Sequence, residues 1–211
     1  MLDRDERIAD ARGVPPFFFH QVYDALDLPP WEIDRAQRAV RDAMQRGWFA
    51  STLLDVGCGT GCNAVMLAQA GFDVVGTDLV PAAIRVAQTR AMDAGVASRV
   101  RFVACDALDM RGFVEDGCVS SVLDSAFCHV LSDADRPRYV EELRRCTRKG
   151  ASIVMLNFNE HESRGGPRRM SIDDCTAMLG AEFRLDCAVE TRYESTAHEG
   201  GAAAWLLRFL R

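Results

Sequence analysis

One run of residues, Leu53-Leu-Asp-Val-Gly-Cys-Gly-Thr-Gly61, constrains the fold of this chain more than any other feature. An apolar stretch ends at an acidic residue, and three glycines then alternate with other residues. Glycine lets the backbone turn sharply and lets a ligand approach without a Cβ in the way. The run therefore predicts a strand, a tight turn and a helix N-terminus, whose unpaired N–H groups suit a nucleoside-containing cofactor.

Acidic residues mark the ends of four predicted strands, at Asp55, Asp78, Asp106 and Asp124. Asp78 follows 17 positions after Gly61, where a carboxylate at the end of the next strand can bind both ribose hydroxyls. In doubly wound sheets, ligands bind at the carboxyl ends of the strands near the switch point. We therefore expect the site at this edge of the sheet.

The glycine spacing leaves the type of nucleotide open. The dinucleotide pattern G-x-G-x-x-G fails from Gly57, because position 62 is Cys, but the looser G-x-G-x-x-A fits from Gly59 through Ala64. An NAD-dependent oxidoreductase is therefore one interpretation. Asp55 argues against it, since a carboxylate there would repel a pyrophosphate and would suit a cation such as the ammonium of an amino-acid group.

Strands and helices alternate from position 51 onward, which predicts an α/β fold with a buried, mostly parallel sheet. The last predicted pair of strands is a hairpin, because apolar and polar residues alternate over 183–194 and 198–201 form a turn before a final strand. The other strands are predicted at 53–56, 74–77, 100–104, 119–123 and 151–157, and the helices at 63–70, 81–94 and about 133–149. In front of them, residues 29–37 are predicted to open a helix that runs to about Gln45.

Composition bounds the class of protein. A chain of 211 residues with 48% hydrophobic residues suits one domain with a modest extension. The net charge of −6 and the lack of a long basic run argue against nucleic acid as a partner, and no apolar run is long enough to span a membrane. The charged N-terminus is unlike a signal peptide, and the eight cysteines form no C-x-x-C pair, so we expect reduced thiols, no bound metal and a cytoplasmic location.

Residues Leu54 to Gly61 resemble, position for position, the first motif of the class I S-adenosylmethionine-dependent methyltransferases. The resemblance implies a Rossmann-like, doubly wound sheet of seven strands, mostly parallel with the last antiparallel. It also implies that Asp78 holds the ribose, that Asp106 and the Ala107 backbone contact adenine, and that Asp55 faces the methionine portion. The full set of expected S-adenosylmethionine contacts is Trp31, Arg35, Asp55, Gly57, Cys58, Gly59, Gly61, Asn63, Asp78, Leu79, Asp106, Ala107, Asp124 and Ser125.

Residues 29–37 are similar to the Pro-Pro-Trp-Asp-Ile-Gly-Arg-Pro-Gln of a small-molecule subgroup related to thiopurine and thiol or halide methyltransferases. This resemblance implies that residues 1–50 form a helical lid and much of the acceptor pocket, in front of a cofactor-binding domain at 51–211. Several positions depart from the subgroup, including Asp34 for Gly, Cys128 for Phe and Asn157-Phe-Asn159 for Cys-Phe-Ser. These departures put a thiol or halide acceptor in doubt.

The loop after the fourth predicted strand contains His129, the one neutral-pH base in it. His129 is interpreted as a general base or a donor that positions the acceptor, or else as a structural histidine packed on the sheet end and bonded to backbone. A thiol needs little help to ionise, so a base matters more for an oxygen acceptor. The expected acceptor contacts are Phe18, Phe19, Trp31, Cys128, Arg168 and Arg169.

The sequence thus predicts in-line methyl transfer from S-adenosylmethionine to a small molecule, at sulfur or oxygen. Two alternatives stay open beside the NAD interpretation. One is an O-methyltransferase that tailors a natural product with His129 as its base, and the other is a protein that binds S-adenosylmethionine without transferring methyl.

Overall fold

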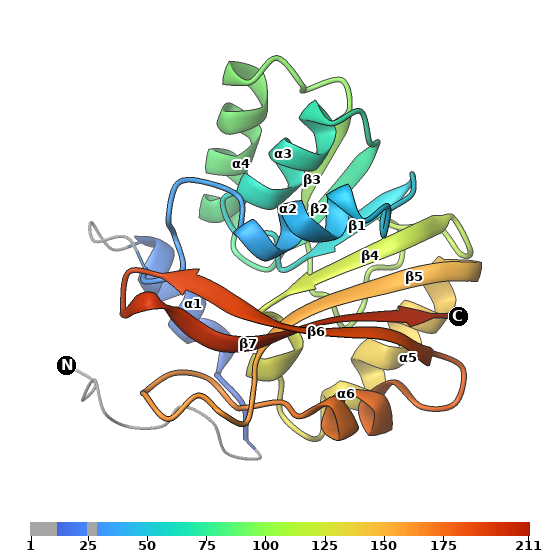
Figure 1. The fold of residues 1–211 in the computed structure, drawn as a ribbon. Helices are drawn as coiled ribbons and strands as arrows, with labels where there is room; N and C mark the ends of the chain where they lie inside the picture. Colours follow the sequence, from blue (N-terminus) through green and yellow to red (C-terminus); the bar gives the residue numbers. More distant parts are fainter. Residues whose placement is uncertain (1–11, 25–28) are drawn as a thin grey trace.

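Seven strands form one sheet in the order β3-β2-β1-β4-β5-β7-β6 in the computed structural model, which describes residues 12–24 and 29–211 (Figure 1). The strands are β1 (Leu53–Val56), β2 (Val74–Asp78), β3 (Val100–Ala104), β4 (Val119–Ser125), β5 (Thr147–Phe158), β6 (Arg184–Ser195) and β7 (His198–Leu210). The helices are α1 (Pro16–Asp24), α2 (Arg38–Gln45), α3 (Cys62–Gln69), α4 (Pro81–Asp93), α5 (Arg136–Cys146) and α6 (Ile172–Leu179), with a short 3₁₀ turn η1 (Cys128–Val130).

The first five strands run parallel, and β7 runs antiparallel to both of its neighbours, β5 and β6. This arrangement confirms the predicted Rossmann-like sheet with one antiparallel strand. The strand order reverses at β1, which lies between β2 and β4. The carboxyl ends of these three strands therefore meet at the switch point, where the sequence places its acidic residues.

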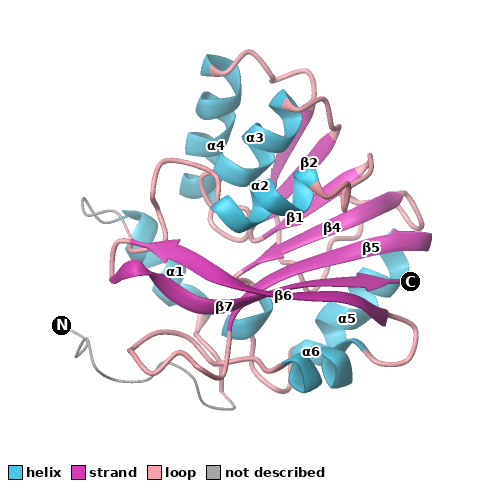
Figure 2. Ribbon diagram, in the orientation of Figure 1, coloured by secondary structure: helices cyan, strands magenta, loops and turns pink. Residues whose placement is uncertain are grey.

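Helices cover both faces of the sheet, with α2, α3 and α4 on one side and α5 and α6 on the other (Figure 2). Successive residues of β1 point to opposite layers, so Leu53 packs into the first core and Leu54 into the second. Both side chains are fully buried. Burial on both faces explains why the central strands are continuously apolar.

The helix predicted over about 133–149 is shorter at both ends in the structure, and side-chain hydrogen bonds explain its earlier C-terminal end. The helix expected over about 133–149 is α5, which begins at Arg136 and ends at Cys146, and β5 starts at the next residue. The Thr147 hydroxyl donates to the Leu143 carbonyl at 2.6 Å, and the guanidinium of Arg211 donates to the carbonyl of Arg144. These side chains satisfy the last carbonyls of the helix, so no glycine is needed to stop it.

The hairpin turn also differs from its prediction at 198–201. The chain turns at 196–197, and His198 already pairs with Ser195 as the first residue of β7. Helix α6 is not among the elements predicted from the sequence. Its signal is a capping box, in which the Ser171 hydroxyl accepts from the Asp174 N–H while the Asp174 carboxylate accepts from the Ser171 N–H.

The described residues of the N-terminal part, 12–24 and 29–50, are only partly helical. The helix expected to open within 29–37 begins at Arg38, and the residues before it are irregular. Asp34 has a φ of +55°, a left-handed conformation that aspartate tolerates better than most residues. The predicted lid over 1–50 includes residues 1–11 and 25–28, which lie outside the described residues. Within the described ranges, none of the helices combines the length and apolar character that crossing a membrane requires.

Candidate functional site

The loop between β1 and α3 brings two glycines into different surroundings. Gly61 precedes α3 with a φ of +80°, and a Cβ there would lie 2.7 Å from the Phe102 ring. Gly59 has a φ of +53°, and a Cβ there would lie 2.7 Å from the Tyr23 hydroxyl. Gly61 is therefore required for packing inside the fold, whereas Gly59 lets a group approach the loop from α1.

Asp78, at the end of β2, is tied to this loop. One carboxylate oxygen accepts from the Gly59 N–H at 2.8 Å, and the other accepts from the Val80 N–H at 2.9 Å. Burial raises the pKa of Asp78, and these backbone bonds partly offset the effect. The bonds fix a carboxylate beside the glycine loop, as the sequence predicts for a ribose-binding residue.

Asp55, in β1, is a buried polar group whose hydrogen bonding is incomplete. Its side chain is 1% exposed, and Oδ2 has no hydrogen-bond partner among the described residues. Burial and the nearby charges of Asp78 and Asp124 raise its pKa to about 8. A cation placed next to this carboxyl would favour its ionised form.

An aromatic roof, defined here as Phe18, Phe19, Tyr23 and Trp31, comes from α1 and the segment that follows it. The Trp31 Nε1–H donates to the Tyr23 hydroxyl at 3.0 Å, and both phenylalanine rings lie within 6.5 Å of the Trp31 ring. Burial, with the charge of Asp78 second, raises the pKa of Tyr23. Tyr23 is absent from the predicted site, although the aromatic run Pro15–Tyr23 was a usable signal.

A cluster of polar side chains anchors the segment after Trp31 to α3 and α4. The Glu32 carboxylate accepts from the Thr60 hydroxyl and from the Cys62 thiol at 3.5 Å. Arg90 pairs with Asp34 at 2.6 Å and with Glu32 at 3.7 Å. The possible metal ligands Glu32, Asp34 and Cys62 lie close together, but Arg90 already supplies the positive charge. This anchoring role was not predicted from the sequence, because no local motif links residues that lie so far apart in the chain.

Several predicted cofactor contacts make other contacts in the fold. Arg35 pairs with Glu194 at 2.9 Å, and the Asn63 side chain accepts from the Gln37 N–H at 2.9 Å. Asp106 accepts from the Leu108 N–H in a turn after β3. The remaining predicted positions lie along the ends of the same strands and in the loop between β1 and α3, namely Gly57, Cys58, Leu79, Ala107 and Ser125.

Asp124 has a clear structural task at the end of β4. One oxygen accepts from the N–H groups of Phe127 and Cys128 at 3.0 and 3.1 Å, and the other accepts from the Tyr139 hydroxyl at 2.9 Å. The side chain is fully buried, and burial raises its pKa. Asp124 therefore shapes the η1 turn, and its carboxylate is held by the protein itself.

The η1 turn sends its residues to different faces of the sheet. Cys128 is fully buried on the α5 side, and its thiol donates to the Asn157 side-chain oxygen at 3.5 Å. His129 is 3% exposed, and its ring lies 5.6 Å from the Phe158 ring in an edge-to-face arrangement. Its Nδ1 has no partner within the described part of the chain. Burial, followed by the charges of Arg169 and Arg136, lowers the pKa of His129 to about 3, so the imidazole is neutral at neutral pH.

Phe158, at the end of β5, is the centre of a group of rings. Tyr193 and His198 lie 5.4 and 5.3 Å from it, and the Arg169 guanidinium lies 5.7 Å from its ring centre. Arg168 pairs with Asp133. The two predicted acceptor-binding arginines thus lie at the His129 end of the sheet. Tyr193 and His198 were not predicted as site residues. They lie next to Phe158 only because the β6–β7 hairpin folds onto β5.

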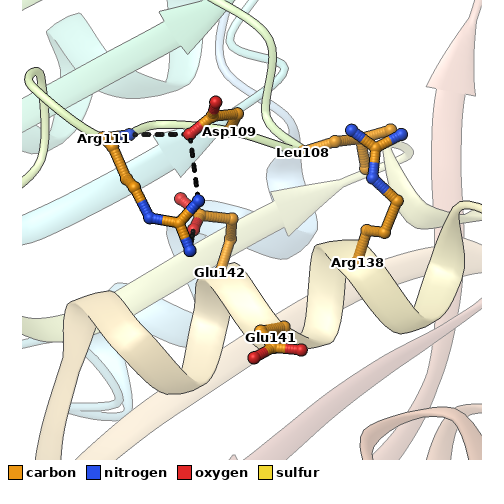
Figure 3. A pocket seen from close by; sticks show the side chains of 6 residues that line it. All are labelled: Leu108, Asp109, Arg111, Arg138, Glu141 and Glu142. Carbon is orange, nitrogen blue, oxygen red and sulfur yellow. Dashed lines mark hydrogen bonds and ion pairs between the residues drawn. The ribbon is translucent and has the colours of Figure 1, made fainter.

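Figure 3 shows a separate groove between the segment after β3 and α5. Three of its charged side chains pair with one another, since Arg111 lies 3.6 Å from Asp109 and 4.0 Å from Glu142. The Glu142 carboxylate also accepts from the Met110 N–H. The lining includes neither the glycine loop nor His129, so the groove is a structural seam.

Comparisons with known proteins agree with this geometry. Residues 53–150 match the family described as methyltransferase domain. The chain is 30% identical over 132 residues to 2-heptyl-1-hydroxyquinolin-4(1H)-one methyltransferase of Mycobacteroides abscessus, covering 63% of this chain and 57% of that protein. It is 33% identical over 107 residues to ajmaline N-methyltransferase of Rauvolfia serpentina, covering 50% of this chain and 35% of that protein. The chain thus spans less than two thirds of the length of these curated relatives.

Among solved structures, one is similar over 93% of both chains, with 28% identity and a TM-score of 0.81. It was determined in work on the conversion of a disulfide bond into a thioacetal group during echinomycin biosynthesis. Geranyl diphosphate C-methyltransferase of Streptomyces coelicolor, solved with S-adenosyl-L-homocysteine, has a TM-score of 0.65 and 16% identity over 82% of this chain and 78% of that one. This second likeness shows the shared fold alone.

Proposed function

We propose that this chain acts as a class I S-adenosylmethionine-dependent methyltransferase and moves a methyl group from that cofactor to sulfur or oxygen of a small-molecule acceptor. The observation that carries the proposal is the bond between the Asp78 carboxylate and the Gly59 N–H. It joins the end of β2 to the glycine loop in the arrangement that a nucleoside needs.

The residues at this end fit S-adenosylmethionine better than a dinucleotide. Asp55, whose buried Oδ2 has no hydrogen-bond partner among the described residues, suits the ammonium of an amino-acid group and would oppose a pyrophosphate. Gly59 opens the loop toward α1, and a Cβ there would fill that approach. The NAD interpretation, which depends on Gly59, Gly61 and Ala64, therefore has less support.

We assign the chain's own residues as follows. Asp78 binds the ribose hydroxyls, Asp106 and the Ala107 backbone contact adenine, and Asp55 binds the ammonium. When bound, the cofactor supplies a methyl group on a sulfonium, which is already an activated leaving group. The chain's contribution is to hold the acceptor in line, and such positioning can supply several kcal/mol, up to about 7–11. Residues 1–50 act as the lid, with the aromatic roof as its described inner part.

The relatives leave the accepting atom open, since their names concern a hydroxyquinolone, an alkaloid nitrogen and a disulfide. The His129 site bears on this question. Because burial lowers the pKa of His129 to about 3, its neutral imidazole accepts a hydrogen bond but is a weak base for a phenol or alcohol. A positioning role therefore fits His129 better than proton abstraction, and the relation to thiopurine or halide enzymes stays a prediction.

The direct test is release of S-adenosylhomocysteine from S-adenosylmethionine with benzenethiol and with phenol, measured side by side. Turnover of benzenethiol alone would support a sulfur acceptor with His129 in a positioning role. Turnover of phenol would support an oxygen acceptor and reopen the base role of His129. A protein that binds S-adenosylhomocysteine but turns over neither these nor a wider panel of thiols and phenols would contradict the proposed transfer and favour the non-catalytic alternative.

A further inference from the structure

We propose that the acceptor is an uncharged, planar aromatic molecule with one hydroxyl or thiol, held between the aromatic roof and a floor of His129, Phe158 and Tyr193. This inference rests on the proposed function and names the substrate class of the same site. It depends on side chains that the cofactor assignment does not use.

The roof offers ring faces in place of charges. Phe18 and Phe19 are only half-buried, although they lie edge to face at 5.4 Å and both approach Trp31. Trp31 is also half-buried. Half-buried aromatic rings gathered on one helix and its following segment leave apolar surface that a flat ring can cover.

The floor is made of rings that hold one another. Phe158 is 3% exposed and fixes the planes of His129 and Tyr193, which lie 5.6 and 5.4 Å from it. Tyr193 is 7% exposed, and burial followed by the charge of Glu32 raises its pKa.

Backbone bonds tie the roof to both sides of the floor. The Val14 N–H, just before α1, donates to the Val130 carbonyl beside His129 at 2.8 Å. The Thr196 N–H, at the hairpin turn after Tyr193, donates to the Pro30 carbonyl beside Trp31 at 2.9 Å. The segments that carry the roof therefore lie against the segments that carry the floor.

Charged groups at this end are compensated within the protein. Glu162 accepts from the Arg164 guanidinium at 2.7 Å and from the Ala203 N–H at 2.7 Å. The Arg169 guanidinium lies against Phe158, and its Nε–H donates to the Glu162 carbonyl at 2.9 Å. A charged acceptor would have to compete with these contacts, whereas an uncharged ring would not.

The unpartnered Nδ1 of His129 defines the acceptor's polar group. An unsatisfied polar atom buried in a protein is unfavourable, so the fold gains if a ligand completes the bond. In a neutral imidazole, a nitrogen without a proton accepts, and a hydroxyl or thiol of the acceptor would donate to it. The same bond would orient the accepting oxygen or sulfur.

The test measures binding of small probes to the complex of the protein with S-adenosylhomocysteine, at pH 7 by calorimetry. Phenol should bind about tenfold more tightly than cyclohexanol, because a saturated ring of the same size loses the aromatic contacts. Phenol should also bind more tightly than anisole, which lacks the O–H, and than 4-hydroxybenzoate, which carries a charge. Equal binding of phenol and cyclohexanol, or binding of neither, would overturn the inference.

Variants separate recognition from folding. His129→Phe keeps a ring and should abolish the preference for phenol over anisole, while a preference that persists would contradict the role of Nδ1. Phe158→Leu should reduce the preference for phenol over cyclohexanol, and Phe113→Leu, at an exposed position, is the matched control. Titration of S-adenosylhomocysteine alone tests the proposed function separately, because its failure there would not depend on the acceptor probes.

Discussion

The two ends of the proposed site, at β1–β2 and at η1–β5, are built in different ways. At the first end, the Asp78 carboxylate is held by the N–H groups of Gly59 and Val80, all within one strand–loop–helix region. At the second end, His129 and Phe158 come together with Tyr193 from a distant hairpin. At the proposed cofactor end, the key contacts come from the backbone of one local region. At the proposed acceptor end, they come from side chains of segments that are far apart in the sequence.

This difference explains why one half of the site is easy to recognise and the other is specific to this chain. A cofactor shared by many proteins can be held by backbone groups and glycines, which leave a sequence motif. In the proposed site, the acceptor is recognised by side chains from α1, η1, β5 and β6, which are far apart in the sequence and leave no single motif.

The largest expected effect comes from Gly61→Val at the cofactor end. The φ of +80° and the Phe102 ring 2.7 Å from the new Cβ together predict a loss of about 2–5 kcal/mol in the free energy of unfolding. Chemical denaturation measures this loss. Gly47→Val is the matched control, because Gly47 has a φ of +69° with open space around it. An equal loss in both variants would mean that Gly61 matters only for its backbone conformation.

Asp55 gives the next largest effect, as a dependence of stability on pH. Burial raises the pKa of Asp55 in the folded protein to about 8, whereas an unfolded aspartate titrates near 4. The folded state therefore keeps the proton while the unfolded state loses it, and stability falls as pH rises from about 4 to 8. Relative to Asp55→Asn, the wild type should lose about 2–4 kcal/mol of unfolding free energy between pH 5 and pH 8.

Unfolding of both proteins across this pH range checks the Asp55 prediction, with Asp109→Asn at an exposed position as the control. A wild type and an Asp55→Asn variant with parallel pH profiles would show that the Asp55 carboxyl is not perturbed by burial.

Asp78→Asn should weaken binding of S-adenosylhomocysteine by about 10- to 100-fold, because one of the two accepting carboxylate oxygens is replaced by an NH2 donor and the negative charge is lost. Calorimetric titration measures the affinity. Asp73→Asn is the control, since the Asp73 side chain is 65% exposed and pairs with Arg99. Unchanged affinity in Asp78→Asn would reject the ribose role and would mean that the β1–β2 end of the site does not bind the cofactor through Asp78.

Tyr23→Phe should have the smallest effect. It removes the hydroxyl that accepts from Trp31 Nε1 and should cost about 1 kcal/mol of unfolding free energy. If thermal unfolding finds no loss, the aromatic roof is held by ring packing alone. A loss as large as that of Gly61→Val would instead mean that the roof is part of the core.

Much of the fold follows from the sequence because its signals are local. The apolar runs of β1 and β5 and the alternation along β6 give strands, and Pro81 opens α4 as predicted. The end of α5 was misplaced because its carbonyls are bound by Arg211, at the far end of the chain. No local sequence pattern predicts that contact.

The same reasoning applies to the candidate site. Gly59 and Asp78 were identified from their spacing, and the structure places them in direct contact. Asp124 could not be read in the same way, since its bonds to the η1 backbone and Tyr139 depend on how the turn closes. Tyr193 reaches Phe158 through the hairpin, so its position emerges only from the assembled sheet.

The most direct test of the central assignment is calorimetric titration of S-adenosylhomocysteine and of NADH into the wild-type protein under the same conditions. We predict that S-adenosylhomocysteine binds with one site per chain and that NADH does not bind. Binding of NADH, or binding of neither molecule, would contradict the assignment of the Gly59–Asp78 site to S-adenosylmethionine.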